Sequence, residues 1–90
     1  MATEKKKVER VQTGVRIEKR ILKVLKAVAA HHEMSLGDLL EGIVLHSFEG
    51  RAPFDPDTLA FIATMRSAYR LDLTAQDSHR MVDDGPAAEG

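Results

Sequence analysis

Residues 11–17 read Val-Gln-Thr-Gly-Val-Arg-Ile, and this short stretch carries the strongest indication of how the chain folds. Alternate residues share one side of an extended segment, and on one side these are Val11, Thr13, Val15 and Ile17. The opposite side carries Arg10, Gln12, Gly14 and Arg16. A period of two is typical of a β-strand with one buried face. We therefore expect a short strand near the amino terminus.

A single strand leaves its backbone N–H and C=O groups unpaired, so it needs a second strand beside it. Because no other segment has a convincing strand pattern, the simplest partner is the same segment of a second copy, paired antiparallel across a two-fold axis. A register shift of one residue would bury Arg16, so the arginine side must face solvent. The pattern thus predicts a homodimer whose interface contains Val11, Thr13, Val15, Ile17, Leu22, Leu25, Leu40, Ile43 and Val44.

Three helices are expected after the strand, followed by a short fourth. From Glu18 to about His32, apolar residues recur three and four positions apart, which is typical of an amphipathic helix. Ser35 and Asp38 have capping-box spacing, so a second helix should begin near Leu36. Gly50 and the proline at position 53 should end it.

The region after residue 50 should also be helical. Asp55 is a capping residue and Pro56 suits the first helical position, so a third helix begins there. Its narrower apolar face consists of Leu59, Ile62, Met65 and Tyr69. The spacing of Thr74 and Asp77 predicts a short fourth helix that ends at about Val82.

The composition limits the class of protein. The chain has 90 residues, 43% of them hydrophobic and 30% charged, which favours one small globular unit. It has no Cys, so neither disulfides nor a thiolate metal site can stabilise it, and association with another chain is the leading alternative. No apolar run approaches the ~20 residues of a membrane helix, and we expect a cytoplasmic protein without membrane contact.

The net charge of −1 hides a strong asymmetry along the chain. Residues 1–26 hold nine Lys and Arg against three Glu, a balance of +6, while residues 27–90 hold four Arg against eleven acids, a balance of −7. A basic block on an acidic body favours contact with a polyanion, because neutralised phosphates release bound counterions. The expected contacts with the DNA backbone from this block are Lys5, Lys6, Lys7, Arg10 and Lys19.

A two-stranded ribbon fits the major groove of DNA, where Arg and Gln can contact guanine and adenine edges. The order Val-Gln-Thr-Gly-Val-Arg-Ile, a Lys-rich helix, and Met34-Ser35-Leu36-Gly37-Asp38-Leu39-Leu40 resembles the ribbon-helix-helix family of dimeric DNA-binding proteins, which includes Arc and the methionine repressor. The resemblance covers about residues 8–48. It implies a mainly α fold with one paired strand, two core helices and one or two further helices.

By position, the resemblance implies base contacts from Gln12, Gly14 and Arg16, and a phosphate clamp formed by Ser35, Leu36 and Gly37. The start of a helix suits phosphate because free N–H groups and the positive end of the dipole converge there. Two positions depart from the family pattern. Gly14 removes a reading side chain, and Glu33 lies in the turn where the family often has Gly or Asn.

The expected organisation is a flexible basic arm at 1–7, a ribbon-helix-helix domain at 8–49, a helical extension at 50–82 and a disordered tail at 83–90. The expected function is a homodimeric, sequence-selective DNA-binding protein, a transcriptional regulator or repressor. No motif indicates an enzyme or a cofactor. His31 and His32 point in directions ~100° apart on a helix, so we expect no metal site.

An alternative is an antitoxin-like or other protein-interaction module. The region 55–82 extends beyond what the family core needs, and its apolar face either packs on its own dimer or binds a partner protein.

Overall fold

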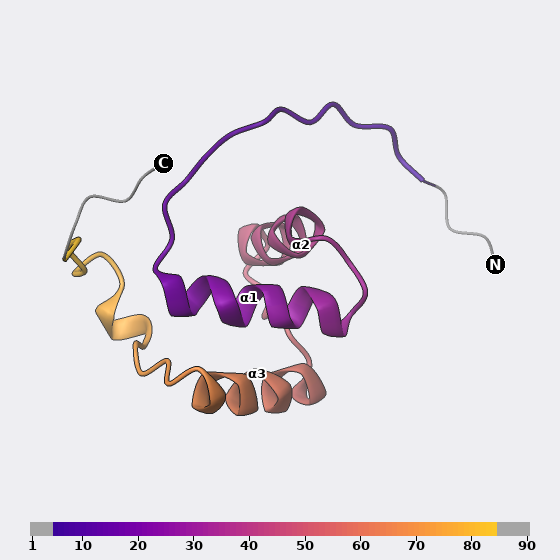
Figure 1. The fold of residues 1–90 in the computed structure, drawn as a ribbon. Coiled ribbons are helices and arrows are strands. Elements are labelled where there is room, and N and C mark those ends of the chain that lie inside the picture. The colour runs from indigo at the N-terminus through magenta and orange to yellow at the C-terminus, as the bar shows by residue number, and fades with distance from the viewer. Residues whose placement is uncertain (1–4, 85–90) are drawn as a thin grey trace.

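A computed structural model describes residues 5–84 and shows three helices with α1 in the middle (Figure 1). The helices are α1 (Lys19–His31), α2 (Leu36–Phe48) and α3 (Pro56–Ala68), followed by the 3-10 turn η1 (Ala75–Asp77). α2 packs on one side of α1 and α3 on the other, without contact between α2 and α3. The expected mainly α composition and the positions of the three helices are confirmed.

The expected strand is wrong. Residues 5–18 form neither helix nor strand, and no strand occurs anywhere in residues 5–84. This amino-terminal segment arcs past α2 without running beside another extended stretch (Figure 1). A strand exists only where a neighbour accepts and donates its backbone hydrogen bonds, and among residues 5–84 the segment has no such neighbour. The ribbon-helix-helix fold is therefore not supported.

The expected fourth helix is also shorter than its pattern suggested. η1 contains three residues and ends at Asp77, well before Val82. Thr74 and Asp77 do form the expected local contact, because the Thr74 N–H donates to the Asp77 carboxylate at 2.7 Å. Capping chemistry alone cannot extend a helix whose later residues, from Ser78 to Val82, lack a regular apolar stripe.

Three helix starts are satisfied by side-chain oxygens. Ser35 Oγ accepts from the Asp38 N–H at 3.0 Å, and Asp55 Oδ1 accepts from the Thr58 N–H at 2.8 Å. These are the two caps expected from the sequence. At α1 the cap is Glu18, whose Oε1 accepts from the N–H groups of Arg20 and Ile21 at 2.9 and 3.0 Å. Each cap satisfies N–H groups that the first helical turn leaves free.

The core lies along α1. Its buried members are Val24, Val28, Ala29, Leu39 and Leu71, and Val28 is only 1% exposed. Further apolar residues of all three helices pack around them at partial burial. Five buried hydrophobic residues are few for a chain of this length, so much of the apolar surface stays in contact with solvent.

Candidate nucleic-acid interface

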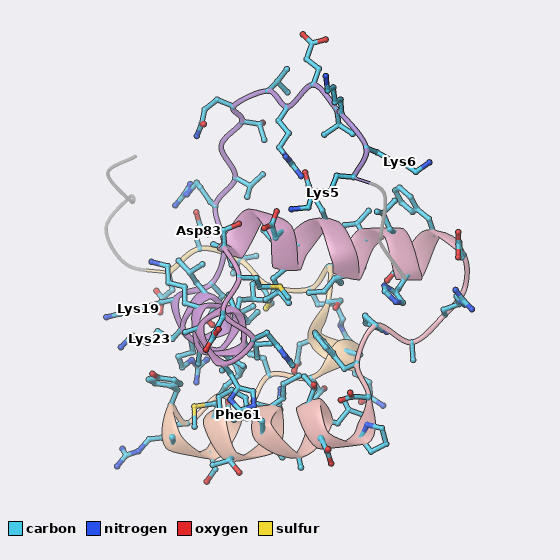
Figure 2. The ribbon with its side chains drawn as sticks, turned by 90° about the vertical axis from the view of Figure 1, so that its right-hand side faces the viewer. Lys5, Lys6, Lys19, Lys23, Phe61 and Asp83 are labelled. Atoms are coloured by element: carbon cyan, nitrogen blue, oxygen red, sulfur yellow. The ribbon has the colours of Figure 1, made fainter. Side chains whose placement is uncertain are left out.

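The lysines of the basic block project into solvent. Lys5, Lys6 and Lys7 lie on the exposed amino-terminal segment, and Lys19 and Lys23 extend outward from α1 (Figure 2). Lys23 has one aromatic neighbour, since its Nζ lies 5.7 Å from the ring centroid of Tyr69. The other lysines named here have no ion pair in residues 5–84. Their charges are therefore available to an approaching anion.

Arg10 is bound to the first half of α2. Its Nε and Nη2 each donate to one carboxylate oxygen of Glu41 at 2.7 Å, and Nη2 lies 3.8 Å from Asp38. These hydrogen bonds raise the pKa of Arg10 above its ordinary value and lower the pKa of Glu41. A two-point contact between guanidinium and carboxylate is the strongest geometry for this pair. Arg10 is therefore the best-anchored residue of the amino-terminal segment.

The three predicted base-contacting positions, Gln12, Gly14 and Arg16, are all exposed. Arg16 Nη2 lies 2.7 Å from Asp83 Oδ2, so the guanidinium is paired with the segment that follows η1. A Cβ added to Gly14 would meet no atom within 4 Å, so the missing side chain leaves open space. The three positions lie on one segment, which the rest of the chain holds through the ion pairs of Arg10 with Glu41 and of Arg16 with Asp83.

Arg20, which the sequence did not single out for structure, joins the start of α1 to the segment after α3. Its guanidinium donates to Glu18 at 3.0 Å, to the Arg70 carbonyl at 2.9 Å and to Asp72 at 3.1 Å. Partial burial raises the pKa of Glu18, but the Ile21 N–H and Arg20 outweigh that effect and hold it below its ordinary value. Arg20 is thus committed to structure, unlike Lys19 beside it.

The predicted phosphate clamp lies at the start of α2 and contains Ser35, Leu36 and Gly37. Its geometry is that of a capped helix start, since Ser35 Oγ already accepts from Asp38. The carboxylates of Asp38 and Glu41 add negative charge there, and Arg10 balances part of it. Asp38 was predicted only as a helix cap, and Glu41 was not predicted as a site residue. Both belong to the acidic part of the chain, residues 27–90, and that excess of acids was the available signal.

The predicted dimer-interface residues divide into two groups. Leu25 and Ile43 pack on the core of their own chain, and Ile17, Leu22 and Leu40 are half-buried. Val11, Thr13, Val15 and Val44 are exposed. α2 exposes two further apolar residues, Leu45 at 62% and Phe48 at 80%. Leu45 was missed, although the apolar run from Ile43 to Leu45 leaves α2 without a purely polar face.

Half of the predicted apolar face of α3 packs within the chain. Ile62 and Met65 pack on the core beside Phe61, while Leu59 and Tyr69 stay exposed. The Phe61 side chain points toward α1 and stacks on the His31 ring, with centroids 4.0 Å apart (Figure 2). His32 Nε2 lies 3.1 Å from Thr58 Oγ1. Both histidines therefore hold the end of α1 to α3.

A shallow hollow of about 250 Å³ lies between α2 and the start of α3. Its apolar lining includes Met34, Leu39, Ile43 and Phe54, and its polar lining includes His32 and Asp55. Asp55 is engaged by the backbone of Thr58, which lowers the pKa of this carboxyl. In residues 5–84, no three His, Asp or Glu side chains are grouped to hold a metal ion.

No family model, curated protein or solved structure matches the chain. Within residues 5–84, each helix is too short or too polar to cross a membrane. The predicted arm at 1–7 and tail at 83–90 fall partly on positions 1–4 and 85–90, which lie outside the described residues.

Proposed function

We propose that this chain is a homodimeric, cytoplasmic DNA-binding protein that regulates transcription. The observation that carries the proposal is the stretch 5–17 of the amino-terminal segment, which is exposed for almost its whole length and holds Lys5, Lys6, Lys7, Arg10 and Arg16 against Glu9 alone. Such a segment can follow a phosphate backbone because no secondary structure of its own must be broken.

The neighbouring helix extends the same positive surface. Lys19 and Lys23 lie at the start of α1, directly after the segment, and both face solvent (Figure 2). The long-range field of this surface attracts DNA without regard to sequence. Selectivity for DNA sequence is assigned to Gln12 and Arg16, because their side chains can form two-point hydrogen bonds with adenine and guanine edges.

A second copy is part of the proposal because one chain covers its apolar groups poorly. Val11 and Val15 of the segment are 80% and 73% exposed, and Leu45 and Phe48 of α2 are 62% and 80% exposed. The exposed valines of the segment and the exposed side of α2 are the surfaces proposed to meet. A stable obligate interface removes about 2,000 Å² or more from solvent and is rich in apolar side chains.

The experiment is a salt titration of binding to a random-sequence duplex. For the wild-type chain, log K falls linearly with log salt, by roughly 0.9 for each phosphate neutralised. Replacing Lys5, Lys6 and Lys7 together with Ala reduces the steepness by up to about 2.7, since three contacts are lost. Exposed cations outside the proposed surface supply the control, and Arg51→Ala with Arg80→Ala leaves the slope unchanged.

The selective residues need a second measurement. A sequence selected from random duplexes is compared with a scrambled duplex, and Arg16→Ala reduces the affinity ratio by about 10-fold or more. An unchanged ratio contradicts the base-reading role of Arg16. A wild-type chain that binds no duplex at low salt contradicts the proposed function as a whole.

A further inference from the structure

Both arginines of the amino-terminal segment are already paired with carboxylates of the same chain. Glu41 holds Arg10 from α2 through two hydrogen bonds of 2.7 Å, and Asp83 holds Arg16 at 2.7 Å. Glu41 and Asp83 belong to different elements, and each lies far from its arginine in sequence. These are therefore tertiary contacts, and local chain geometry alone does not produce them.

The carboxylates occupy the donors that a DNA contact would use. The Arg fork presents parallel N–H groups that match a carboxylate and a phosphate equally well. With Glu41 in place, Nε and Nη2 of Arg10 are both committed. A phosphate or base edge can take these donors only after the carboxylate leaves.

From this geometry we infer that Glu41 and Asp83 are built-in competitors of DNA, which lower its affinity by holding Arg10 and Arg16. This inference rests on the proposed function and adds its regulation. The lysines of the same surface stay free and make the first encounter. The two arginines are released only when the DNA contacts replace their internal partners.

The exposure of the pairs sets the size of the effect. The Arg10 and Glu41 side chains are 61% and 47% exposed, and those of Arg16 and Asp83 are 61% and 76% exposed. Pairs this exposed stabilise weakly, and each is expected to reduce DNA affinity by about two- to fivefold. The Arg10 pair should lie at the upper end, because two hydrogen bonds and the nearby Asp38 hold it.

The test compares the affinities of the Glu41→Gln and Glu33→Gln variants for the same DNA duplex at one low salt concentration. Both substitutions remove one negative charge, but Glu33 is exposed and has no ion pair in residues 5–84. Glu41→Gln should tighten binding by about two- to fivefold more than Glu33→Gln. In the Arg10→Gln background this extra gain should disappear, which assigns it to the pair.

The second pair has its own control on the same segment. Asp83→Asn is compared with Asp84→Asn, because Asp84 has no ion pair in the described residues. The Asp83 variant should tighten duplex binding by about twofold more than its neighbour, and Arg16→Gln should abolish the difference. If neither variant gains more duplex affinity than its control, while the wild-type chain does bind the duplex, the inference is wrong and the proposed function still holds.

The competition by Glu41 and Asp83 can also be tested if the proposed DNA-binding function fails. If the wild-type chain binds no duplex, the proposed function fails, and elution of the same variants from immobilised heparin decides the competition. Later elution of Glu41→Gln than Glu33→Gln supports the inference for polyanions in general. Identical elution overturns it.

Discussion

Three residues with positive φ follow the carboxyl ends of the three main helices. Glu33, Gly50 and Arg70 have φ of 56°, 72° and 57°. After each, the next N–H donates back across the helix end: Met34 to Ala29 at 2.9 Å, Arg51 to His46 at 2.9 Å and Leu71 to Arg66 at 2.8 Å. The same closing turn therefore ends α1, α2 and α3, although only one of them has the residue best suited to it.

Gly50→Ala should lower the free energy of unfolding by about 1 kcal/mol, because a Cβ disfavours the left-handed backbone. Steric contacts add nothing to this destabilisation, since a Cβ at Gly50 meets no atom within 4 Å. Urea denaturation measures the change. Gly14→Ala is the matched control, with equally open space and no positive φ, and it should leave the unfolding midpoint nearly unchanged.

At the scale of elements, carboxylates begin two of the helices and make their stability depend on pH. The pKa of Asp55 is lowered by the Thr58 N–H, and that of Glu18 lies below its ordinary value of 4.5. The folded chain therefore binds fewer protons than the unfolded chain in acid, so protonation favours unfolding. The stabilisation is complete above the ordinary pKa values and is lost as pH falls through the lower folded values.

We expect the free energy of unfolding to stay level from pH 7 to about 5 and to decrease below the ordinary values of 4.5 and 3.8. Urea midpoints at several pH values measure this dependence. Asp55→Asn keeps an oxygen for the Thr58 N–H but removes the titrating charge, so its decrease should be shallower. If the free energy of unfolding decreases as steeply in Asp55→Asn and in Glu18→Gln as in the wild type, other carboxylates control its pH dependence.

In the molecule as a whole, α2 is the helix whose apolar side chains are covered least well by the rest of the chain. Only Leu39 of α2 is buried, whereas Leu45 and Phe48 are exposed. α1 and α3 cover each other, but α2 rests on α1 alone. An apolar helix covered on one side is typical of an interface between copies.

The mass in solution should therefore be that of a dimer at micromolar concentration, and the double variant Leu45→Gln with Phe48→Gln should raise the dissociation constant about 100-fold or more. Each side chain buries an apolar surface equivalent to about 1.5–3 kcal/mol, and two-fold symmetry counts it twice. Light scattering measures the mass. Val82→Gln, at a residue 87% exposed and outside α2, should leave it unchanged.

The local residues of the chain were enough to predict the three helices and two of their caps. Ser35 and Asp55 each begin a helix as expected, because an N-cap depends on residues only three positions away. The apolar residues that recur three and four positions apart in α1 include its buried members Val24, Val28 and Ala29. The alternation in residues 11–17 was misleading, since period two describes side-chain direction and cannot supply a pairing partner.

Neighbours along the chain thus specify where the three main helices begin and where positive charge accumulates, so both were predictable from the sequence. Three features became visible only in the folded chain: Glu41 and Asp83 hold the two arginines, Arg20 joins α1 to the segment after α3, and one side of α2 stays exposed. These contacts join residues distant in sequence. Their formation depends on how whole helices pack, which no local pattern of residues specifies.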